Sequence, residues 1–225
     1  MKTAVCLQVR LDSSRLPEKA LIKIKDLTII EHAMRALKEI KADQFLLLTT
    51  EDCINHLRKL AESWGFTLFS GPKDDVLKRF ILAAEKYGID TIIRATGDNP
   101  LVSSEIANKV LEEHKQLAVD YSNWYNAPLG TGVEVVQVQA LKRAEKESEK
   151  NYDHEHVTPW IYNNSDIFTL NIKQVPKEYI WDSKVSVDTE EDLIKMKKIF
   201  KDLYQNKPIR VLDLIHYLKQ EKKSE

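Results

Sequence analysis

The chain has few of the residues that mark secreted, metal-clustered or multidomain proteins. Cys6 and Cys53 are its two cysteines, and they form no CxxC or metal-type spacing, so we expect free thiols. Six glycines and seven prolines are scattered, and nowhere dense enough to predict a linker between domains. No apolar run approaches the roughly 20 residues of a membrane span, and the N-terminus lacks a secretory h-region. These absences predict a soluble, cytoplasmic protein with a single domain over residues 1–225.

A strong charge of either sign is also absent. Lys and Arg together number 34 and Asp and Glu 35, which gives a net charge of −1. The protein therefore has no overall field that would attract nucleic acid or a membrane surface. Any site for an anionic ligand must be local.

Strand and helix patterns alternate through the first half of the chain. We expect strands at 4–7, 45–49, 66–69 and 91–95, and helices at about 28–41, 52–64, 75–87 and from 103 onward. The short apolar strand at 45–49 is typical of a parallel sheet that is covered on both faces. Thr28 and Glu31 are spaced as a capping box at a helix start. This order predicts an α/β, three-layer Rossmann-like fold.

The second half is less regular. We expect strands at 133–138, 168–175 and 185–187, and helices at about 140–150, 154–162 and 189–204. The segment 121–175 is interpreted as an insertion that forms a lid over the acceptor site. The charged residues 220–225 are expected to fray.

A basic loop follows the first strand. Arg10, Ser13, Ser14, Arg15 and Lys19 are crowded into it. In an open α/β sheet, ligands bind in the crevice beyond the carboxyl ends of the strands. Arginine forks and a lysine charge there suit a polyphosphate, and they can neutralise the charge that develops on leaving pyrophosphate. The spacing is not that of a Walker loop. The alternative is a solvated basic turn.

Two aspartates follow expected strands elsewhere in the chain. Asp98 comes after the strand at 91–95, and the preceding Gly97 lets a ligand approach the backbone closely. Asp188 comes after the expected strand at 185–187 and before a helix. Carboxylates in such places are suited to holding Mg²⁺ against phosphates. The alternatives are a turn residue for Asp98 and a simple N-cap for Asp188.

Two further stretches carry weaker signals. Backbone groups of the loop from Gly71 to Asp75 could read the edge of a base, and Arg79 could reach a phosphate or brace the loop; an ordinary capped helix is the alternative. His154, Glu155 and His156 do not match HExxH, so we expect them to shape the acceptor pocket or to pack. Four aromatic residues could either stack on a sugar or belong to a core: Tyr121, Trp124, Tyr125 and Trp160.

Together these stretches resemble the SpsF-type, cytidylyltransferase-like proteins of spore-coat polysaccharide synthesis and, more distantly, CMP-KDO synthetases and acylneuraminate cytidylyltransferases. The similarity covers about Thr3 to Phe200. The family's Q-A-R-x-x-S-T-R-L-P-G-K is similar to residues 8–19, and R-x-T-G-D-x-P-L matches 94–101 in full. Shorter matches are G-x-x-D-V-L-x-R at 71–79 with one extra residue, the Asp-Tyr pair at 120–121, E-H-V-T-P at 155–159 and V-D-T-x-E-D-L at 187–193.

The resemblance implies a GT-A-like nucleotidyltransferase fold with a mixed, mostly parallel sheet. It implies transfer of a nucleotidyl group, CMP from CTP, to a sugar or related acceptor for a surface polysaccharide, with release of pyrophosphate. It also implies that Asp98 and Asp188 hold Mg²⁺. The identity of the nucleoside triphosphate and homodimer formation are left open.

The resemblance carries site roles onto particular residues. The expected catalytic residues are Arg10, Arg15, Lys19 and Asp98. The expected nucleotide-binding residues are Leu11, Ser13, Ser14, Gly71, Asp75, Arg79, Arg94, Thr96 and Gly97. The expected acceptor-binding residues are Tyr121, Asn123, Glu134, His154 and Glu155.

The chain departs from the family pattern at two positions. Asp12 and Glu18 stand where the family usually has glycine, and each adds negative charge beside the expected phosphates. We expect both side chains to face solvent or to pair with a lysine or arginine. Two rival functions are a GT-A glycosyltransferase, which would use a DxD motif that no expected strand end carries, and a catalytically weak nucleotide-binding module.

Overall fold

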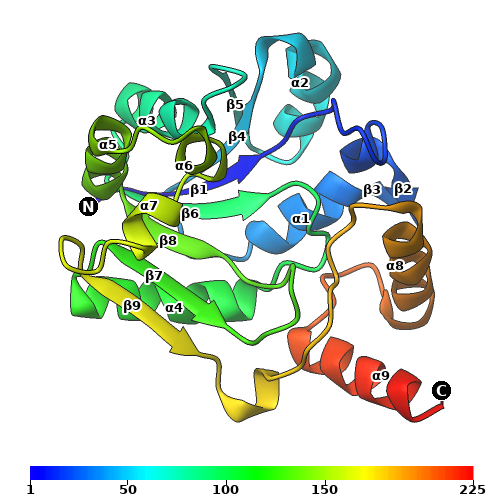
Figure 1. The fold of residues 1–225 in the computed structure, drawn as a ribbon. Helices are drawn as coiled ribbons and strands as arrows, with labels where there is room; N and C mark the ends of the chain where they lie inside the picture. The colour runs from blue at the N-terminus through cyan, green and yellow to red at the C-terminus, as the bar shows by residue number, and fades with distance from the viewer. Residues whose placement is uncertain (225) are drawn as a thin grey trace.

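The computed structural model describes residues 1–224, and within them a seven-stranded sheet forms the centre of the molecule (Figure 1). The strand order is β5-β4-β1-β6-β8-β7-β9. The strands span Thr3–Gln8 (β1), Gln44–Thr49 (β4), Thr67–Ser70 (β5), Thr91–Thr96 (β6), Tyr121–Tyr125 (β7), Glu134–Gln137 (β8) and Leu170–Gln174 (β9). β8 runs antiparallel to both of its neighbours, while the other pairs are parallel. The expected mixed, mostly parallel sheet is therefore confirmed.

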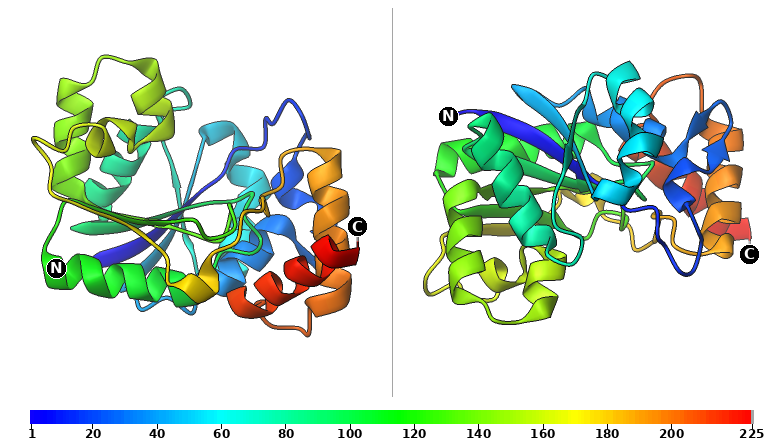
Figure 2. Two further views of the ribbon diagram at one scale, coloured as in Figure 1. Left: turned by 60° about the horizontal axis from the view of Figure 1, so that its bottom comes forward. Right: turned by 90° about the horizontal axis from the view of Figure 1, so that it is seen from above.

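Helices cover both faces of this sheet (Figure 2). Alternate residues of β1 point to opposite sides, so Val5 and Leu7 pack toward α1, α2 and α4, while Ala4 and Cys6 pack toward α3, α5 and α7. These helices span Ile29–Leu37 (α1), Ile54–Ser63 (α2), Val76–Tyr87 (α3), Ser104–Leu117 (α4), Val138–Glu147 (α5) and Pro159–Tyr162 (α7). A fully buried side chain such as Leu7 contributes roughly 1.5–3 kcal/mol to folding. The three-layer α/β architecture is confirmed.

Local capping explains where three of these helices begin and where α3 ends. The expected capping box of Thr28 and Glu31 is present at the start of α1. Asp75 caps α3 by accepting a hydrogen bond from the backbone of Lys78, and Ser103 caps α4. Gly88 ends α3 in the left-handed conformation, with φ of 63°. The expected helix boundaries in the first half are therefore close to the observed ones.

The C-terminal part differs from expectation. Residues 185–187 do not form the expected strand; an isolated bridge joins Leu129 to Lys184 instead. After this segment come α8 (Glu190–Leu203) and α9 (Val211–Ser224), which share an apolar cluster with β2 (Lys23–Ile24) of a small β2–β3 hairpin, β3 being Leu27–Thr28. Helix α9 was not expected from the sequence. Residues 220–224, expected to fray, continue this helix.

The segment 121–175 is part of the central sheet, because it supplies β7, β8 and β9. The single helix expected at 154–162 is two short helices, α6 (Asn151–His156) and α7, separated at Val157, whose φ is 77°. A role for this segment as a lid stays a prediction. In residues 1–224, no helix is long and apolar enough to cross a membrane.

Candidate functional site

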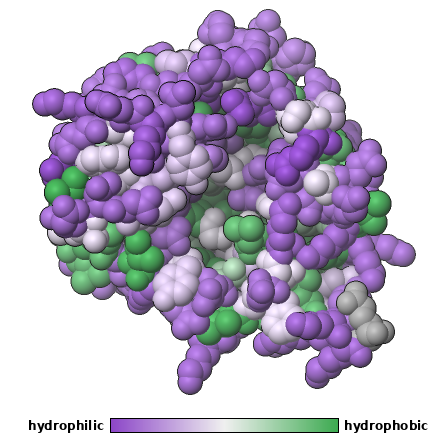
Figure 3. Space-filling view, in the orientation of Figure 1, coloured by the Kyte–Doolittle hydropathy of each residue, from purple (hydrophilic) through white to green (hydrophobic). Residues whose placement is uncertain are grey.

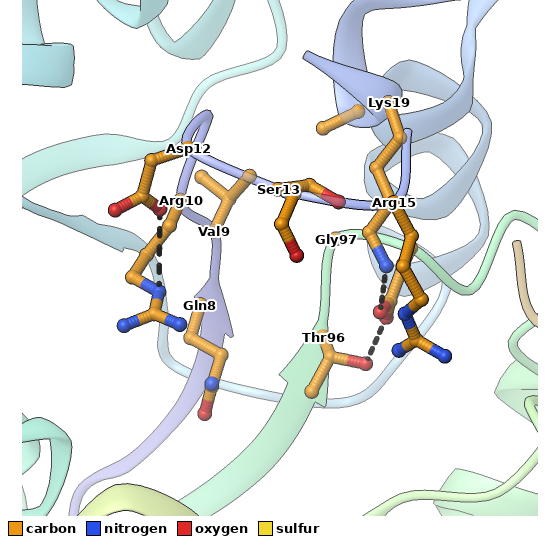
Figure 4. A pocket seen from close by; sticks show the side chains of 12 residues that line it. Gln8, Val9, Arg10, Asp12, Ser13, Arg15, Lys19, Thr96 and Gly97 are labelled. Carbon is orange, nitrogen blue, oxygen red and sulfur yellow. Dashed lines mark hydrogen bonds and ion pairs between the residues drawn. The ribbon is translucent and has the colours of Figure 1, made fainter. Parts of the chain in front are cut away.

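The basic loop opens a cavity at the carboxyl ends of β1 and β6. Its volume is about 310 Å³ (Figure 4). Most of the expected loop residues line it, together with the turn after β6: Arg10, Ser13, Ser14, Arg15, Lys19, Thr96, Gly97 and Asp98. Leu11 is instead buried in the apolar core, so the structure does not bring its side chain to the cavity. The cavity lies where an open α/β sheet binds its ligands.

Lys19 lies between the two aspartates that were expected to hold a metal. Its Nζ is 2.9 Å from Oδ2 of Asp98 and 2.8 Å from Oδ1 of Asp188. Burial by itself favours the neutral amine, but the two carboxylates outweigh it and raise the pKa of Lys19 above its usual value. Burial also opposes ionisation of Asp188, yet hydrogen bonds from Lys19 and Lys184 lower the pKa of that carboxyl to about 2. Both aspartates thus converge on one cationic group.

Asp188 reaches this position through long-range contacts rather than at the end of a strand. The backbone N–H of Val187 donates to the carbonyl of Asp98 at 2.9 Å, which ties the two aspartate segments together. Lys184 lies 2.9 Å from Asp188 and 2.6 Å from Asp192. Asp192 also accepts from the backbone of Asp188 and completes a capping box with Thr189. Lys184 and Asp192 were not expected at the site from the sequence, although the Thr189–Asp192 spacing is a capping signal.

The residues at this point fit a divalent metal ion. Two carboxylates already face one positive charge, and Mg²⁺ is usually held by one or two carboxylates together with substrate phosphates and water. Within residues 1–224, no group of three or more His, Cys, Asp or Glu side chains could form an all-protein metal site. The donor set therefore matches a metal that a triphosphate helps to hold.

The turn after β6 brings backbone close to backbone. The N–H of Gly97 donates to the carbonyl of Gln8 at 2.9 Å. A Cβ at Gly97 would lie 3.1 Å from two side-chain atoms of Val9. A glycine at this position thus allows β1 and β6 to end side by side with the cavity between them.

Arg79 braces the loop before α3 rather than reaching into the cavity. Its guanidinium is fully buried and donates to the carbonyls of Pro72, at 3.0 and 2.6 Å, and of Lys73, at 3.1 Å. A Cβ at Gly71 would lie 2.8 Å from Cγ of Arg79, so glycine lets the loop close over the arginine. Of the two roles considered for Arg79, the geometry supports the bracing role.

His154 contacts this loop and not the other expected acceptor residues. Its Nδ1 is 2.9 Å from Oδ2 of Asp75, and its Nε2 is 3.2 Å from the carbonyl of Ser148. Burial disfavours the charged imidazole, but these two acceptors outweigh burial and raise the pKa of His154. The ion pair links α6 to the start of α3.

This pair predicts a specific pH dependence of stability. Because the folded pKa of His154 is raised, its contribution is fully present below the unfolded pKa, near 6.5, and is lost as pH rises through the folded value. Wild type should therefore exceed His154→Gln in unfolding free energy at pH 5.5, and the difference should shrink at pH 9. Urea unfolding across this range measures it. In an Asp75→Asn background the same substitution should show a weaker trend, because the Ser148 carbonyl remains; a trend of undiminished size there would contradict the assignment.

A second cavity adjoins the first, and we name it the acceptor pocket after the expected acceptor-binding residues Asn123 and Glu134 that line it. Its volume is about 300 Å³, and its polar lining includes Arg94, Thr96, Asn99, Asn123, Asn126 and Glu134. Thr96 lines both cavities, so they meet at the end of β6. The surface is hollowed near the centre of the face shown in Figure 3.

Only some of the expected acceptor-binding residues line the acceptor pocket. Asn123 and Glu134 line the acceptor pocket, and the buried Tyr121 donates its hydroxyl to Glu134 at 2.5 Å. Glu155 is exposed on α6, 4.0 Å from Arg10 and outside the pocket lining.

The four aromatic residues considered for sugar stacking also differ in position, since one lines the acceptor pocket and the others pack in or against the apolar core. The ring of Trp124 is buried in the apolar core and donates its Nε1–H to Glu113 of α4. Tyr125 is exposed and lines the acceptor pocket. Trp160, in contrast, packs against the apolar cluster beneath α3 and α5, where Tyr121 is also buried.

The two unusual acidic residues of the loop behave as expected. Asp12 lies 3.0 Å from Nζ of Lys73 and 3.6 Å from Nε of Arg10, and the hydrogen bond from Lys73 lowers its pKa. Glu18 is exposed and has a φ of 49°, a left-handed conformation that glycine adopts without strain. The prediction that both side chains face solvent or form ion pairs is confirmed.

Replacing either residue with glycine should therefore have little effect on ligand binding. Asp12→Gly and Glu18→Gly are each expected to change the dissociation constant for CTP by less than about threefold, measured by calorimetric titration. Glu18→Gly should leave stability unchanged or raise it, since relief of about 1 kcal/mol of backbone strain offsets the entropy of glycine. A gain in affinity of tenfold or more would show that the native loop impairs nucleotide binding.

A Rossmann-like sheet with a basic loop and converging aspartates at its carboxyl edge defines a nucleotidyltransferase. A family model described as cytidylyltransferase matches residues 4–224, so the chain belongs to the cytidylyltransferase family. This assigns the protein to the enzymes that transfer nucleotidyl groups, rather than to glycosyltransferases.

Individual relatives agree with this assignment. An uncharacterized protein, MJ1063, of Methanocaldococcus jannaschii is 36% identical over 92% of this chain and 84% of its own length. The spore coat polysaccharide biosynthesis protein SpsF of Bacillus subtilis is 28% identical over 94% of this chain and 92% of its own. A solved structure of a cytidylyltransferase from Leptospira borgpetersenii has a TM-score of 0.90 at 26% identity, covering 99% of this chain and 96% of that one.

The more distant resemblance is also found. A 3-deoxy-manno-octulosonate cytidylyltransferase of Chloroherpeton thalassium is 26% identical, over 49% of this chain and 45% of its own length. The resemblance to SpsF-type and CMP-KDO synthetase proteins is therefore confirmed.

Proposed function

We propose that the protein transfers CMP from CTP to a sugar-like acceptor and releases pyrophosphate, in the synthesis of a surface polysaccharide. The observation that carries the proposal is the Lys19 ammonium between Asp98 and Asp188, in a cavity also lined by Arg10 and Arg15. Cations and two convergent carboxylates at one sheet edge suit a metal-bound triphosphate. Membership of the cytidylyltransferase family and similarity to SpsF support CTP as donor and a polysaccharide precursor as product.

In this mechanism an acceptor hydroxyl oxygen attacks the α-phosphorus in line and loses its proton to solvent water. A new P–O bond forms, and the bond to the bridging oxygen of pyrophosphate breaks. Arg10, Arg15 and Lys19 bind the triphosphate and neutralise the charge that grows on the leaving group. Ser13 and Ser14 present hydroxyls to phosphate oxygens. Most of the rate enhancement comes from positioning and charge neutralisation.

Asp98 and Asp188 are the residues that would hold Mg²⁺, which when bound supplies charge compensation for the phosphates. Without nucleotide, Lys19 holds these carboxylates in place. When the triphosphate binds, its oxygens offer Lys19 a second set of anionic partners. Lys19 then moves from the carboxylates to the phosphates.

The loop from Gly71 to Asp75 is the proposed contact for the base. Arg79 donates hydrogen bonds to the loop carbonyls of Pro72 and Lys73, so the backbone of the loop is held rigidly. A rigid backbone reads the edge of a base with little loss of entropy on binding.

The experiment is a pyrophosphate-release assay with CTP, UTP, GTP and ATP, each with Mg²⁺ and a panel of neutral and acidic sugars. Turnover with CTP well above the other three is the expected result. Release with another nucleotide alone would overturn the choice of CTP, and the absence of release with every pair would favour a binding module.

A further inference from the structure

The charged residues that line the acceptor pocket neutralise each other. Among the described residues that line it, Arg94 is the only cation and Glu134 the only anion. These two side chains form an ion pair, and each is largely buried, with 16% and 14% of the side chain exposed. The lining of the pocket is thus neutral in sum.

Arg94 is held at two points. Besides its contact with Glu134, its Nε donates to Oε1 of Gln8 at 3.1 Å. Gln8 is the last residue of β1, and Glu134 the first of β8, on either side of Arg94 in β6. The guanidinium therefore bridges three adjacent strands rather than extending freely toward a ligand.

Glu134 is also held by other donors. Its Oε1 accepts from the hydroxyl of Tyr121 at 2.5 Å and from the hydroxyl of Thr158 at 2.7 Å, while Oε2 pairs with Arg94. Neutral donors from β7 and from the residue before α7 thus keep the carboxylate pointing at the arginine. If Arg94 moved away, the buried carboxylate of Glu134 would lose its cationic partner.

A carboxylate on the acceptor would have no partner in this pocket. To displace Glu134 from Arg94 it would have to leave a buried carboxylate without its cationic partner, which is strongly unfavourable. If it left the pair intact, the charge of Glu134 would offset the attraction of Arg94, so the carboxylate would have no uncompensated cation to bind. Both routes disfavour an acidic acceptor.

The remaining polar lining suits hydroxyl groups. Asn99, Asn123 and Asn126 present amides, which both donate and accept hydrogen bonds. Sugar hydroxyls have the same dual capacity. Tyr125, which is exposed, adds apolar surface, against which the C–H face of a sugar can lie.

From this geometry we propose that the acceptor is an uncharged polyhydroxyl compound, and that the Arg94–Glu134 pair excludes acceptors with a carboxylate in this pocket. The proposal rests on the proposed cytidylyl transfer, because it names the class of substrate for that reaction.

The test compares wild type with Glu134→Gln. Glutamine retains a carbonyl oxygen for Tyr121 and Thr158 but removes the charge that neutralises Arg94. The probes are the aldonates from glycerate to gluconate and the matching alditols from glycerol to sorbitol, with binding measured by ligand-observed NMR. We expect at least one aldonate to bind Glu134→Gln ten or more times as tightly as wild type, while the alditols change less than threefold. Equal aldonate affinity in both proteins, measurable or not, would overturn the proposal.

Two controls make the result specific. Adding Arg94→Met to Glu134→Gln should abolish the gained aldonate binding; if binding survives, the freed arginine is not its cause. Thermal unfolding of each variant shows whether the fold persists. If Glu134→Gln does not fold, the comparison is made in wild type alone. There, an aldonate that binds more tightly than its matching alditol would overturn the proposal, and an alditol that binds more tightly would support it. These binding data do not depend on CTP, so failure of the pyrophosphate-release assay would count against the proposed function alone.

Discussion

Asp98→Asn and Asp188→Asn are each expected to lower CTP-dependent pyrophosphate release by roughly 10²- to 10³-fold, about 3–4 kcal/mol of transition-state stabilisation. Each substitution keeps the shape of the side chain but removes one of two negative charges that converge on the Lys19 ammonium. The loss should appear mainly in kcat, measured with saturating CTP and Mg²⁺. Thermal unfolding should show that the fold is retained.

Asp12→Asn is the matched control for this prediction. Asp12 lines the same cavity and has the same side chain, but its carboxylate pairs with Lys73 and lies outside the convergent pair. Its substitution should change turnover by less than about threefold. If Asp12→Asn were as damaging as Asp98→Asn, general loss of negative charge would explain the effect better than a metal site.

Lys19→Met should have two opposite effects. Turnover should fall by about 10² or more, because a charge that neutralises the leaving pyrophosphate is lost. Binding of Mn²⁺ without nucleotide should become several-fold tighter, because the ammonium no longer lies between the two carboxylates, where repulsion between like charges costs about 1 kcal/mol or more at ~4 Å. Electron paramagnetic resonance of free Mn²⁺ measures the second effect directly.

Lys73→Met serves as the control for Lys19→Met. Lys73 is a half-exposed lysine beside the same cavity, paired with Asp12 and Asp52. Its loss should leave Mn²⁺ binding unchanged. Unchanged or weaker Mn²⁺ binding by Lys19→Met would mean that Asp98 and Asp188 do not form the metal site.

The parts of the site that are local in sequence could be predicted from it. The basic loop follows an apolar strand directly, and the turn with Gly97 and Asp98 follows another, so their shared edge follows from the parallel order of β1 and β6. The helix starts at Thr28 and Ser103 depend on hydrogen bonds within three residues. Such signals do not require knowledge of the tertiary structure.

The parts that depend on distant partners could not be predicted in the same way. Asp188 contacts Lys19 of the basic loop, but a backbone hydrogen bond from Val187 to Asp98 positions it, and not the strand expected at 185–187. Arg79 braces the loop before α3 because its guanidinium is buried. The same arginine on an exposed helix face would be free to bind a phosphate. No local pattern distinguishes these cases.

The contacts of the expected acceptor-binding residues also depend on residues that are distant in the sequence. His154 was grouped with Glu134, yet the fold pairs it with Asp75, 79 residues earlier in the chain. Glu134 contacts Arg94, Tyr121 and Thr158, which come from three separate segments. Charge neutralisation in the acceptor pocket is therefore a property of the folded chain alone.

The most direct test of the proposed nucleotidyl transfer is a crystal structure with Mn²⁺ and a non-hydrolysable CTP analogue, with the metal located by its anomalous scattering. One Mn²⁺ should be bound by Asp98, Asp188 and triphosphate oxygens, with Lys19 moved onto the phosphates. A triphosphate bound away from the basic loop, or a metal that contacts neither aspartate while Lys19 still lies between them, would contradict the proposal.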